Sequence, residues 1–260
     1  ENGKFFPESR RAADVQSVLE EACRSNGVII RCNEAVQEVR KTGDSFSIRS
    51  EKSEYKARNF LIATGGASYP STGSTGDGYA FARMLGHRIT PVRPALVPLR
   101  VEGYPFSDLS GISFEGLTLT LFRKGKKIWE VEDDLLFTHT GLSGPGVLHL
   151  SRFVHPGDLL VVSFLPHLSS AELKQDLICR VAACGSKQVK SILLDYSLPA
   201  RLVTRILDMS GIPPDLTCAH LPKRERDRLV RFVSAFPFTI TGTGGWEEAM
   251  VTRGGVSLDE

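Results

Sequence analysis

Cysteine is scarce in the 260-residue sequence, and its five cysteines form no Cys-x-x-Cys pair. A redox-active dithiol is therefore not expected, and the odd number is typical of reduced, mostly buried thiols in a cytoplasmic protein. Long hydrophobic runs are also missing, since none approaches the roughly 20 apolar residues of a membrane-spanning helix. These absences predict a cytoplasmic location and no membrane partner. The cysteines are Cys23, Cys32, Cys179, Cys184 and Cys218.

Neither sign of charge is in large excess. The net charge is +2, which gives no general attraction to nucleic acid. A basic run between Lys223 and Arg231 is interleaved with Glu225 and Asp227, and no aromatic platform accompanies it. We interpret this run as a solvated helix face rather than as a nucleic-acid patch, and we predict no nucleic-acid partner.

Motifs of hydrolytic and metal-dependent catalysis are absent. The sequence has no Gly-x-Ser-x-Gly elbow and no Ser-His-Asp order. Its histidines show no pattern with acids or cysteines, so no metal site is predicted. There is no signal peptide, and the sequence begins at Glu1 rather than at a methionine, which suggests a fragment or a trimmed chain.

Glycine, in contrast, is concentrated in the stretch Leu61–Pro98. The apolar run Phe60–Ala63 predicts a strand, and a helix is predicted from about Asp77 to Leu85, stopped by Gly86. Between them, a glycine-rich loop lets backbone N–H groups approach a flat or anionic ligand beside a helix N-terminus. Tight turns at a sheet edge are the alternative. The glycines of this loop and of the first helical turn are Gly65, Gly66, Gly73, Gly76 and Gly78.

The residues before this stretch predict a helix, a strand and a meander. Apolar residues recur at helical spacing from Val15 to Cys23, and Asn26-Gly27 closes that helix. Val28–Arg31 is apolar and predicts a strand. Turn signals separate the three short β-like runs that follow. These runs are Ala35–Arg40, Phe46–Arg49 and Glu54–Ala57.

After Pro98 the pattern predicts a small, mostly antiparallel and barrel-like β-subdomain. A glycine-rich turn around His139 precedes a helical pattern at Val147–Ser151. The segments with strand periodicity are Leu99–Val101, Gly116–Arg123, Lys127–Val131 and Leu159–Phe164.

From Ser169 the periodicity becomes helical. Ser169 and Glu172 form a capping box, Pro199 opens a second helix that ends at Gly211, and Pro222 opens a third. The change of period near residue 166 predicts a β part followed by a helical part.

The last stretch, 236–260, returns to strand and glycine. Thr239–Thr241 can pair as a strand, and Gly254-Gly255 marks a close backbone approach. Because two glycine-rich segments flank a compositionally distinct middle, we predict that Thr64–Asp77 and Val251–Val256 converge in space.

Five motifs occur in order along the chain. They read G-G-A-S-Y-P-S-T-G-S-T-G-D-G-Y from Gly65, G-H-R-I-T-P from Gly86, P-A-L-V-P-L from Pro94, L-F-T-H-T-G-L-S-G-P from Leu136 and E-E-A-M-V-T-R-G-G-V from Glu247. In combination they resemble the BaiN/YhiN-like flavoproteins, FAD-dependent oxidoreductases also described as aminoacetone-oxidase-like. The helix, strand, meander and strand ending in Ala-Thr-Gly likewise resemble the second half of a glutathione-reductase-like FAD-binding domain.

The resemblance implies a multi-domain α/β and α+β fold. Residues 1–97 would form part of an FAD-binding domain, 98–166 a β-rich insert, 167–235 a helical insert, and 236–260 a return to the FAD-binding domain. The family's Gly-x-Gly-x-x-Gly turn and its closing Gly-Glu-x-x-Asp segment are missing here. We therefore expect the central part of a flavoprotein, which alone would not retain FAD and would be inactive.

The resemblance also implies cofactor contacts in three segments. The first segment, Ala63-Thr64-Gly65, would pass the phosphate and adenosine side of FAD. The second, Gly73–Asp77, would place a helix N-terminus near the flavin, and the third, Thr252–Gly255, would touch the same cofactor. The alternatives are a plain strand end for the first segment and an N-cap role for Asp77. The expected residues are Ala63, Thr64, Gly65, Gly66, Gly73, Ser74, Thr75, Gly76, Asp77, Thr252, Gly254 and Gly255.

His139 is the catalytic candidate, and a structural hydrogen bond is its alternative role. For His87, which follows a helix-ending glycine, we favour a C-terminal capping role. The implied reaction is hydride transfer between FAD and a small organic substrate held between the FAD domain and the insert. NADH, NADPH or oxygen as redox partner, and the oligomeric state, stay open. The alternative function is a non-catalytic module on a relic flavoprotein fold that binds a protein or RNA.

Overall fold

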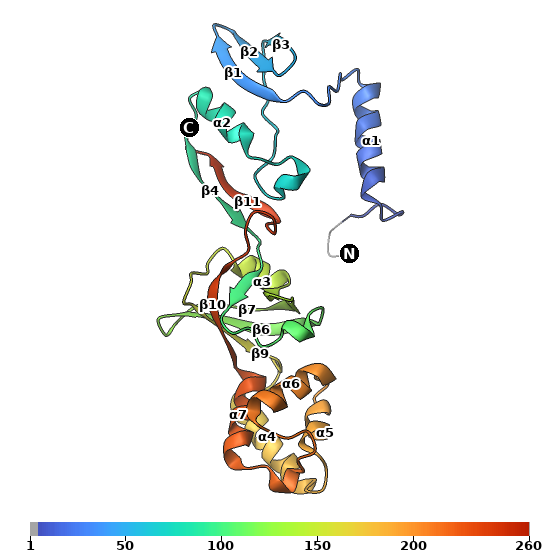
Figure 1. Cartoon of the computed structure of the whole chain (residues 1–260), viewed down its shortest axis with the longest axis vertical. Coiled ribbons are helices and arrows are strands. Elements are labelled where there is room, and N and C mark those ends of the chain that lie inside the picture. Colours follow the sequence, from blue (N-terminus) through green and yellow to red (C-terminus); the bar gives the residue numbers. More distant parts are fainter. Residues whose placement is uncertain (1–4, 260) are drawn as a thin grey trace. The chain divides into compact units, whose positions relative to one another are not determined.

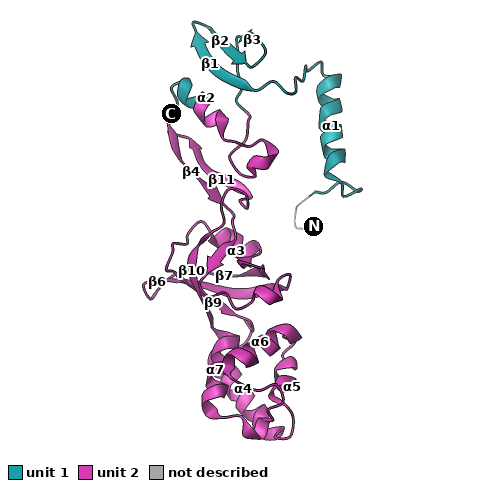
Figure 2. Ribbon diagram, in the orientation of Figure 1, with its two compact units in different colours: residues 1–62, 81–87 teal, residues 63–80, 88–260 magenta. Residues whose placement is uncertain are grey.

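The computed structural model describes residues 5–259 of the chain. These fall into two compact units, coloured separately in Figure 2. Unit 1 takes residues 1–62 and 81–87, and unit 2 takes residues 63–80 and 88–260. Among the described residues, no helix is both long and apolar enough to span a bilayer.

Unit 1 contains the predicted first helix and the predicted meander. Helix α1, Ala12–Ser25, ends where the Gly27 amide donates to the Arg24 carbonyl at 3.0 Å. The three strands form an antiparallel sheet in the order β1-β2-β3 (Figure 1), which confirms the meander. The strands are β1 Val36–Thr42, β2 Ser45–Ser50 and β3 Glu54–Ala57.

Helix α2, Asp77–Met84, follows the glycine-rich loop as predicted. Its end is a Schellman turn: the Gly86 amide donates to Arg83 and the His87 amide donates to Ala82, both at 3.0 Å, and Gly86 has a φ of 95°. In unit 1, Phe81 of this helix is buried together with apolar residues of β1 and β2. The C-terminal end of the helix is therefore fixed by both a cap and a small core.

Two strand predictions are wrong. Neither Val28–Arg31 nor Phe60–Ala63 forms a strand, and both segments lack a ladder partner among the described residues. An apolar run becomes a strand only when its N–H and C=O groups pair with a neighbour. Ile29 and Leu61 are 79% and 84% exposed, so the apolar side chains of these two segments are not packed into a core.

Unit 2 contains a closed six-stranded barrel with the strand order β10-β5-β8-β7-β6-β9. The predicted barrel-like subdomain is confirmed. Inward-pointing strand side chains and Phe106, from the turn after residue 101, form an aromatic centre, in which the rings of Phe106 and Phe137 stack with their centroids 4.7 Å apart. Helix α3, Pro145–Leu150, follows β8. The strands are β5 Leu99–Val101, β6 Ser113–Arg123, β7 Lys126–Phe137, β8 Gly141–Ser143, β9 Leu159–Ser163 and β10 Phe236–Thr243.

Strand β10 closes the barrel and is separated in sequence from the other five strands. It pairs with β9 on one side and with β5 on the other. Residues 236–243 are thus part of the barrel, whereas the sequence suggested that the chain leaves the insert at 236. The assignment of the flanking segments to one cofactor-binding domain stays a prediction.

The helical part lies between β9 and β10. The predicted capping box is present, because Glu172 N donates to Ser169 Oγ at 3.2 Å and Ser169 N donates to Glu172 Oε2 at 2.9 Å. Gly211 ends the second predicted helix with a φ of 73°. One buried apolar cluster runs from the barrel into these helices. They are α4 Ser170–Ala183, α5 Val189–Leu194, α6 Ala200–Ser210 and α7 Lys223–Ser234, of which α5 was not predicted.

The expectation of mostly buried thiols is wrong. All five cysteines are free, but only Cys218 is buried, whereas Cys32 and Cys179 are exposed. Cys218 lies in the helical core, where burial raises the pKa of its thiol.

Candidate cofactor site

A two-stranded ribbon in unit 2 joins the glycine-rich loop to the chain's last segment. Strand β4, Ile89–Ala95, pairs antiparallel with β11, Val251–Val256, so that Ala95 lies opposite Val251 and Ile89 opposite Val256. The sequence did not reveal this ribbon as two strands. Pro91 and Pro94 weaken the strand signal of β4, and its partner lies more than 150 residues away.

Thr252 of the ribbon fixes the glycine-rich loop. Its Oγ1 accepts a hydrogen bond from the Ala67 amide at 2.8 Å and lies 2.9 Å from Ser68 Oγ. A Cβ on Gly66 would lie 2.3 Å from the same Oγ1, a distance that no ordinary contact allows. Gly66 is therefore required by the close approach of the two segments. The predicted convergence of Thr64–Asp77 and Val251–Val256 is confirmed.

Gly254 has a structural role of the same kind. Its φ is +83°, and a Cβ there would lie 2.2 Å from the Pro91 carbonyl oxygen. The ribbon is bulged between Arg253 and Gly255, and the two backbones touch at that point. This contact accounts for Gly254 without a ligand, and a cofactor contact at this position stays a prediction.

The loop also carries backbone donors without a partner. The amides of Gly65, Ser74 and Gly76 form no hydrogen bond within the part of the chain that the structure describes. A Cβ on Gly65 would lie 3.8 Å from Ser74 Oγ, which brings the first two expected cofactor segments together. A Cβ on Gly73 would meet open space. Backbone amides without a partner in a glycine-rich loop before a helix fit the acceptor-rich edge of a dinucleotide cofactor.

Asp77 begins helix α2, and its Oδ1 accepts from the Gly78 amide at 3.0 Å. The carboxylate thus lies against the first turn of the helix, where negative charge is favourable. This bond reaches only the next residue and Asp77 is itself the first residue of the helix, so it is not the N2 or N3 bond of an N-cap, and the role of Asp77 stays a prediction. Ala63, Thr64 and Thr75 are exposed beside it in sequence.

The barrel rim carries a second group of polar residues, around His139. Thr138 Oγ1 donates to the Gly141 carbonyl at 3.0 Å and thereby shapes the turn, while His139 itself is exposed. Arg100 of β5 donates to Thr140 Oγ1 and forms an ion pair with Glu248 at 2.6 Å. The side chains of Arg100 and Glu248 are 32% and 37% exposed, so a guanidinium group is held in place at a half-open rim.

The segment 244–250 links the glycine-rich loop to this rim. Its Trp246 carbonyl accepts from the Tyr69 amide at 3.1 Å, and its Glu248 holds Arg100. Arg100 and Glu248 were not predicted as site residues. Glu248 lies in the last sequence motif, which was the available signal, but only the fold brings Arg100 to it.

The described residues contain no group of three or more histidines, cysteines or acids that could hold a metal ion.

Comparison with known protein families identifies the family of this chain. Residues 93–251 match the HI0933-like protein barrel and H2TH domain, which covers more than half of the chain. The chain belongs to the HI0933-like family. Residues 4–81 match the pyridine nucleotide-disulphide oxidoreductase family, which supports a redox enzyme.

Three curated relatives agree with this assignment. The chain is 29% identical to the 3-dehydro-bile acid delta(4,6)-reductase of Clostridium scindens over 99% of its own length and 64% of the relative's. It is 32% identical to the ribosomal RNA dihydrouridine synthase of Haemophilus influenzae, over 94% of the chain and 60% of that protein. The corresponding Escherichia coli enzyme is 28% identical over 96% and 60%. The chain thus spans about three fifths of the length of these relatives.

The comparisons confirm the resemblance to BaiN-like oxidoreductases. They also show that the prediction of no nucleic-acid partner was wrong, because two relatives act on ribosomal RNA. The net charge of the whole chain was a poor guide, since it averages over parts with different charge.

Proposed function

We propose that this protein is a flavin-dependent reductase that adds hydrogen to a carbon–carbon double bond conjugated with a carbonyl group, and that its substrate is a uridine in ribosomal RNA. The similarity to two ribosomal RNA dihydrouridine synthases carries the choice of substrate. The match of residues 4–81 to an oxidoreductase family supports the chemistry.

The two kinds of relative share one reaction type. Dihydrouridine is uridine whose ring double bond, conjugated with a carbonyl, has been reduced. A 3-dehydro-delta(4,6) steroid likewise has double bonds conjugated with a ketone. In both reductions a hydride adds to an electron-poor carbon of the conjugated system, and the enolate that forms takes up a proton on a carbon of the same system. A site of this class therefore requires a hydride source, a proton donor and positive charge near the carbonyl oxygen.

The chain offers candidate groups for holding the cofactor, for donating the proton and for contacting the carbonyl oxygen. FAD, when bound, supplies the hydride. The unused amides of Gly65, Ser74 and Gly76 would hold acceptor atoms of the cofactor. Arg100 is held at the barrel rim by Glu248, so its charge is paired, but its guanidinium would still donate a hydrogen bond to the carbonyl oxygen. The exposed His139 is the candidate proton donor.

A steroid-like enone is the second candidate substrate. The observation in its favour is the alignment with the bile acid reductase over 99% of this chain. A cytoplasmic location belongs to the main proposal, because that is where ribosomal RNA is found. The choice between NADH and NADPH as electron donor stays open.

The test is the reoxidation of reduced flavin without oxygen. The full-length protein is loaded with FAD, reduced with NADPH or NADH, and mixed with a uridine-containing ribosomal RNA fragment or with a steroid dienone. We expect the flavin absorbance to return with RNA and not with the steroid. A His139→Gln variant should bind RNA normally but reoxidise more slowly, by roughly 10²-fold or more.

Return of the absorbance with the steroid alone would replace the main proposal by the second candidate. RNA binding without reoxidation by either compound would support the non-catalytic alternative. The exposed His155→Gln serves as the matched histidine control, because its side chain lies outside the turn at 138–141.

A further inference from the structure

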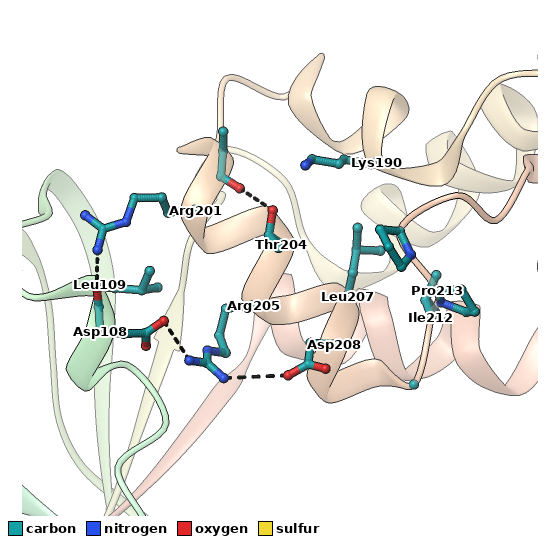
Figure 3. A pocket seen from close by; sticks show the side chains of 13 residues that line it. Asp108, Leu109, Lys190, Arg201, Thr204, Arg205, Leu207, Asp208, Ile212 and Pro213 are labelled. Carbon is teal, nitrogen blue, oxygen red and sulfur yellow. Dashed lines mark hydrogen bonds and ion pairs between the residues drawn. The ribbon is translucent and has the colours of Figure 1, made fainter.

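A cavity of about 690 Å³ opens between the barrel and the helical part of unit 2 (Figure 3). One wall is the short turn that contains Asp108 and Leu109, and the other is helix α6 with the loop after it. Leu207, Ile212 and Pro213 give the cavity an apolar floor. Its volume lies within the range of ordinary ligand sites. It shares no residue with the candidate cofactor site.

Of the three cations that line this cavity, only Arg205 forms an ion pair within the described residues, although Arg201 lies near enough to Asp108 to contribute to the lowered pKa of its carboxyl. Arg205 is neutralised, because it pairs with Asp108 at 2.7 Å and with Asp208 at 3.6 Å. Arg201 instead donates to the main-chain carbonyl of Asp108. Among the described residues, neither Arg201 nor Lys190 of α5 forms an ion pair. The rim therefore offers positive charge that an anion can use.

The part of the chain that forms this wall is more basic than the rest. Residues 167–235 contain eleven Lys and Arg against seven Asp and Glu, whereas the remaining residues contain twenty-one against twenty-three. The helical part thus carries a surplus of four positive charges within a chain of net charge +2. A local surplus of this kind attracts a polyanion even when the total charge is near zero.

We propose that this cavity holds an unpaired nucleotide of the RNA substrate, away from the uridine that is reduced. The base would pack on the apolar floor, and its phosphate would face Lys190 and Arg201. The inference rests on the proposed function for its choice of RNA. The lining contains no aromatic side chain and few groups that could hydrogen-bond to the edge of a base. We therefore expect the cavity to accept nucleotides without a strong preference for the base.

The experiment measures binding of the full-length protein to a ribosomal RNA fragment by fluorescence anisotropy at several salt concentrations. Lys190→Ala and Arg201→Met should each raise the Kd about tenfold and lower the salt slope by about 0.7, the loss of one single-strand phosphate contact. Thr204→Trp should also weaken binding, because an indole on this exposed helix position would fill the cavity.

Lys187→Ala and Ser191→Trp are the matched controls, since both positions are exposed and lie outside the cavity lining. Reduction of bound flavin by NADPH or NADH should be unchanged in all five variants, which checks that they are folded. If the wild type binds RNA and the three cavity variants bind as the controls do, this inference is overturned. If the wild type itself binds no RNA, the proposed substrate fails and the inference fails with it.

Discussion

Replacing Thr252 with valine tests whether one side chain holds the glycine-rich loop to the ribbon. Valine keeps the shape of threonine but removes the oxygen that accepts from the Ala67 amide at 2.8 Å and contacts Ser68 Oγ at 2.9 Å. A part-buried amide then loses its partner, which costs about 2 kcal/mol. In a unit of this size the loss should lower the Tm by roughly 4–8 °C. Flavin binding should weaken as well, because the unused amides of the loop are no longer held in place.

The assay combines thermal unfolding with hydrogen exchange of the peptide that covers residues 64–69. In Thr252→Val this peptide should exchange faster, whereas the barrel strands should keep their protection. Thr204→Val is the control, because the Thr204 hydroxyl only donates to the Ala200 carbonyl within its own helix. Equal exchange and equal Tm in the two variants would refute the role of Thr252.

Three further predictions concern the insert and the isolated chain. The side chain of Asp158 is 3% exposed, and the hydrogen bond from Arg123 at 2.8 Å lowers the pKa of its carboxyl. The ionised carboxylate therefore stabilises the folded state above about pH 4, and this contribution is lost as the pH falls through the lowered pKa. Asp158→Asn should therefore cost about 3 kcal/mol at pH 7 and progressively less as the pH falls below 4, as measured by urea unfolding. Ser169→Ala removes the capping box and should cost about 1 kcal/mol, whereas the exposed Ser186→Ala should cost nearly nothing. Finally, the 260-residue chain purified alone should be colourless, and flavin absorbance at one equivalent per chain after gel filtration would contradict this.

The sequence predicted elements whose signals are local. Caps such as Ser169 and Gly86, the period-2 strands of the barrel and the three-stranded meander depend on neighbouring residues, and the structure contains them all. The strand predictions at Val28–Arg31 and Phe60–Ala63 failed, because apolar composition alone does not supply a hydrogen-bonding partner.

Long-range features were harder to predict. The ribbon of β4 and β11 consists of segments with proline and glycine in strand positions, and its pairing follows only from the fold. The Arg100–Glu248 pair joins residues 148 positions apart. The cavity beside Lys190 requires the packing of α6 against the barrel turn at Asp108, which no local pattern indicates.

The most direct measurement of the central claim is the mass of a treated ribosomal RNA. An unmodified transcript is incubated with the full-length protein, FAD and a reduced nicotinamide, then digested to nucleosides. We predict that one uridine gains two hydrogen atoms, and that this product disappears without flavin and falls strongly in His139→Gln. RNA that keeps its original mass while a steroid dienone is reduced under the same conditions would contradict the account.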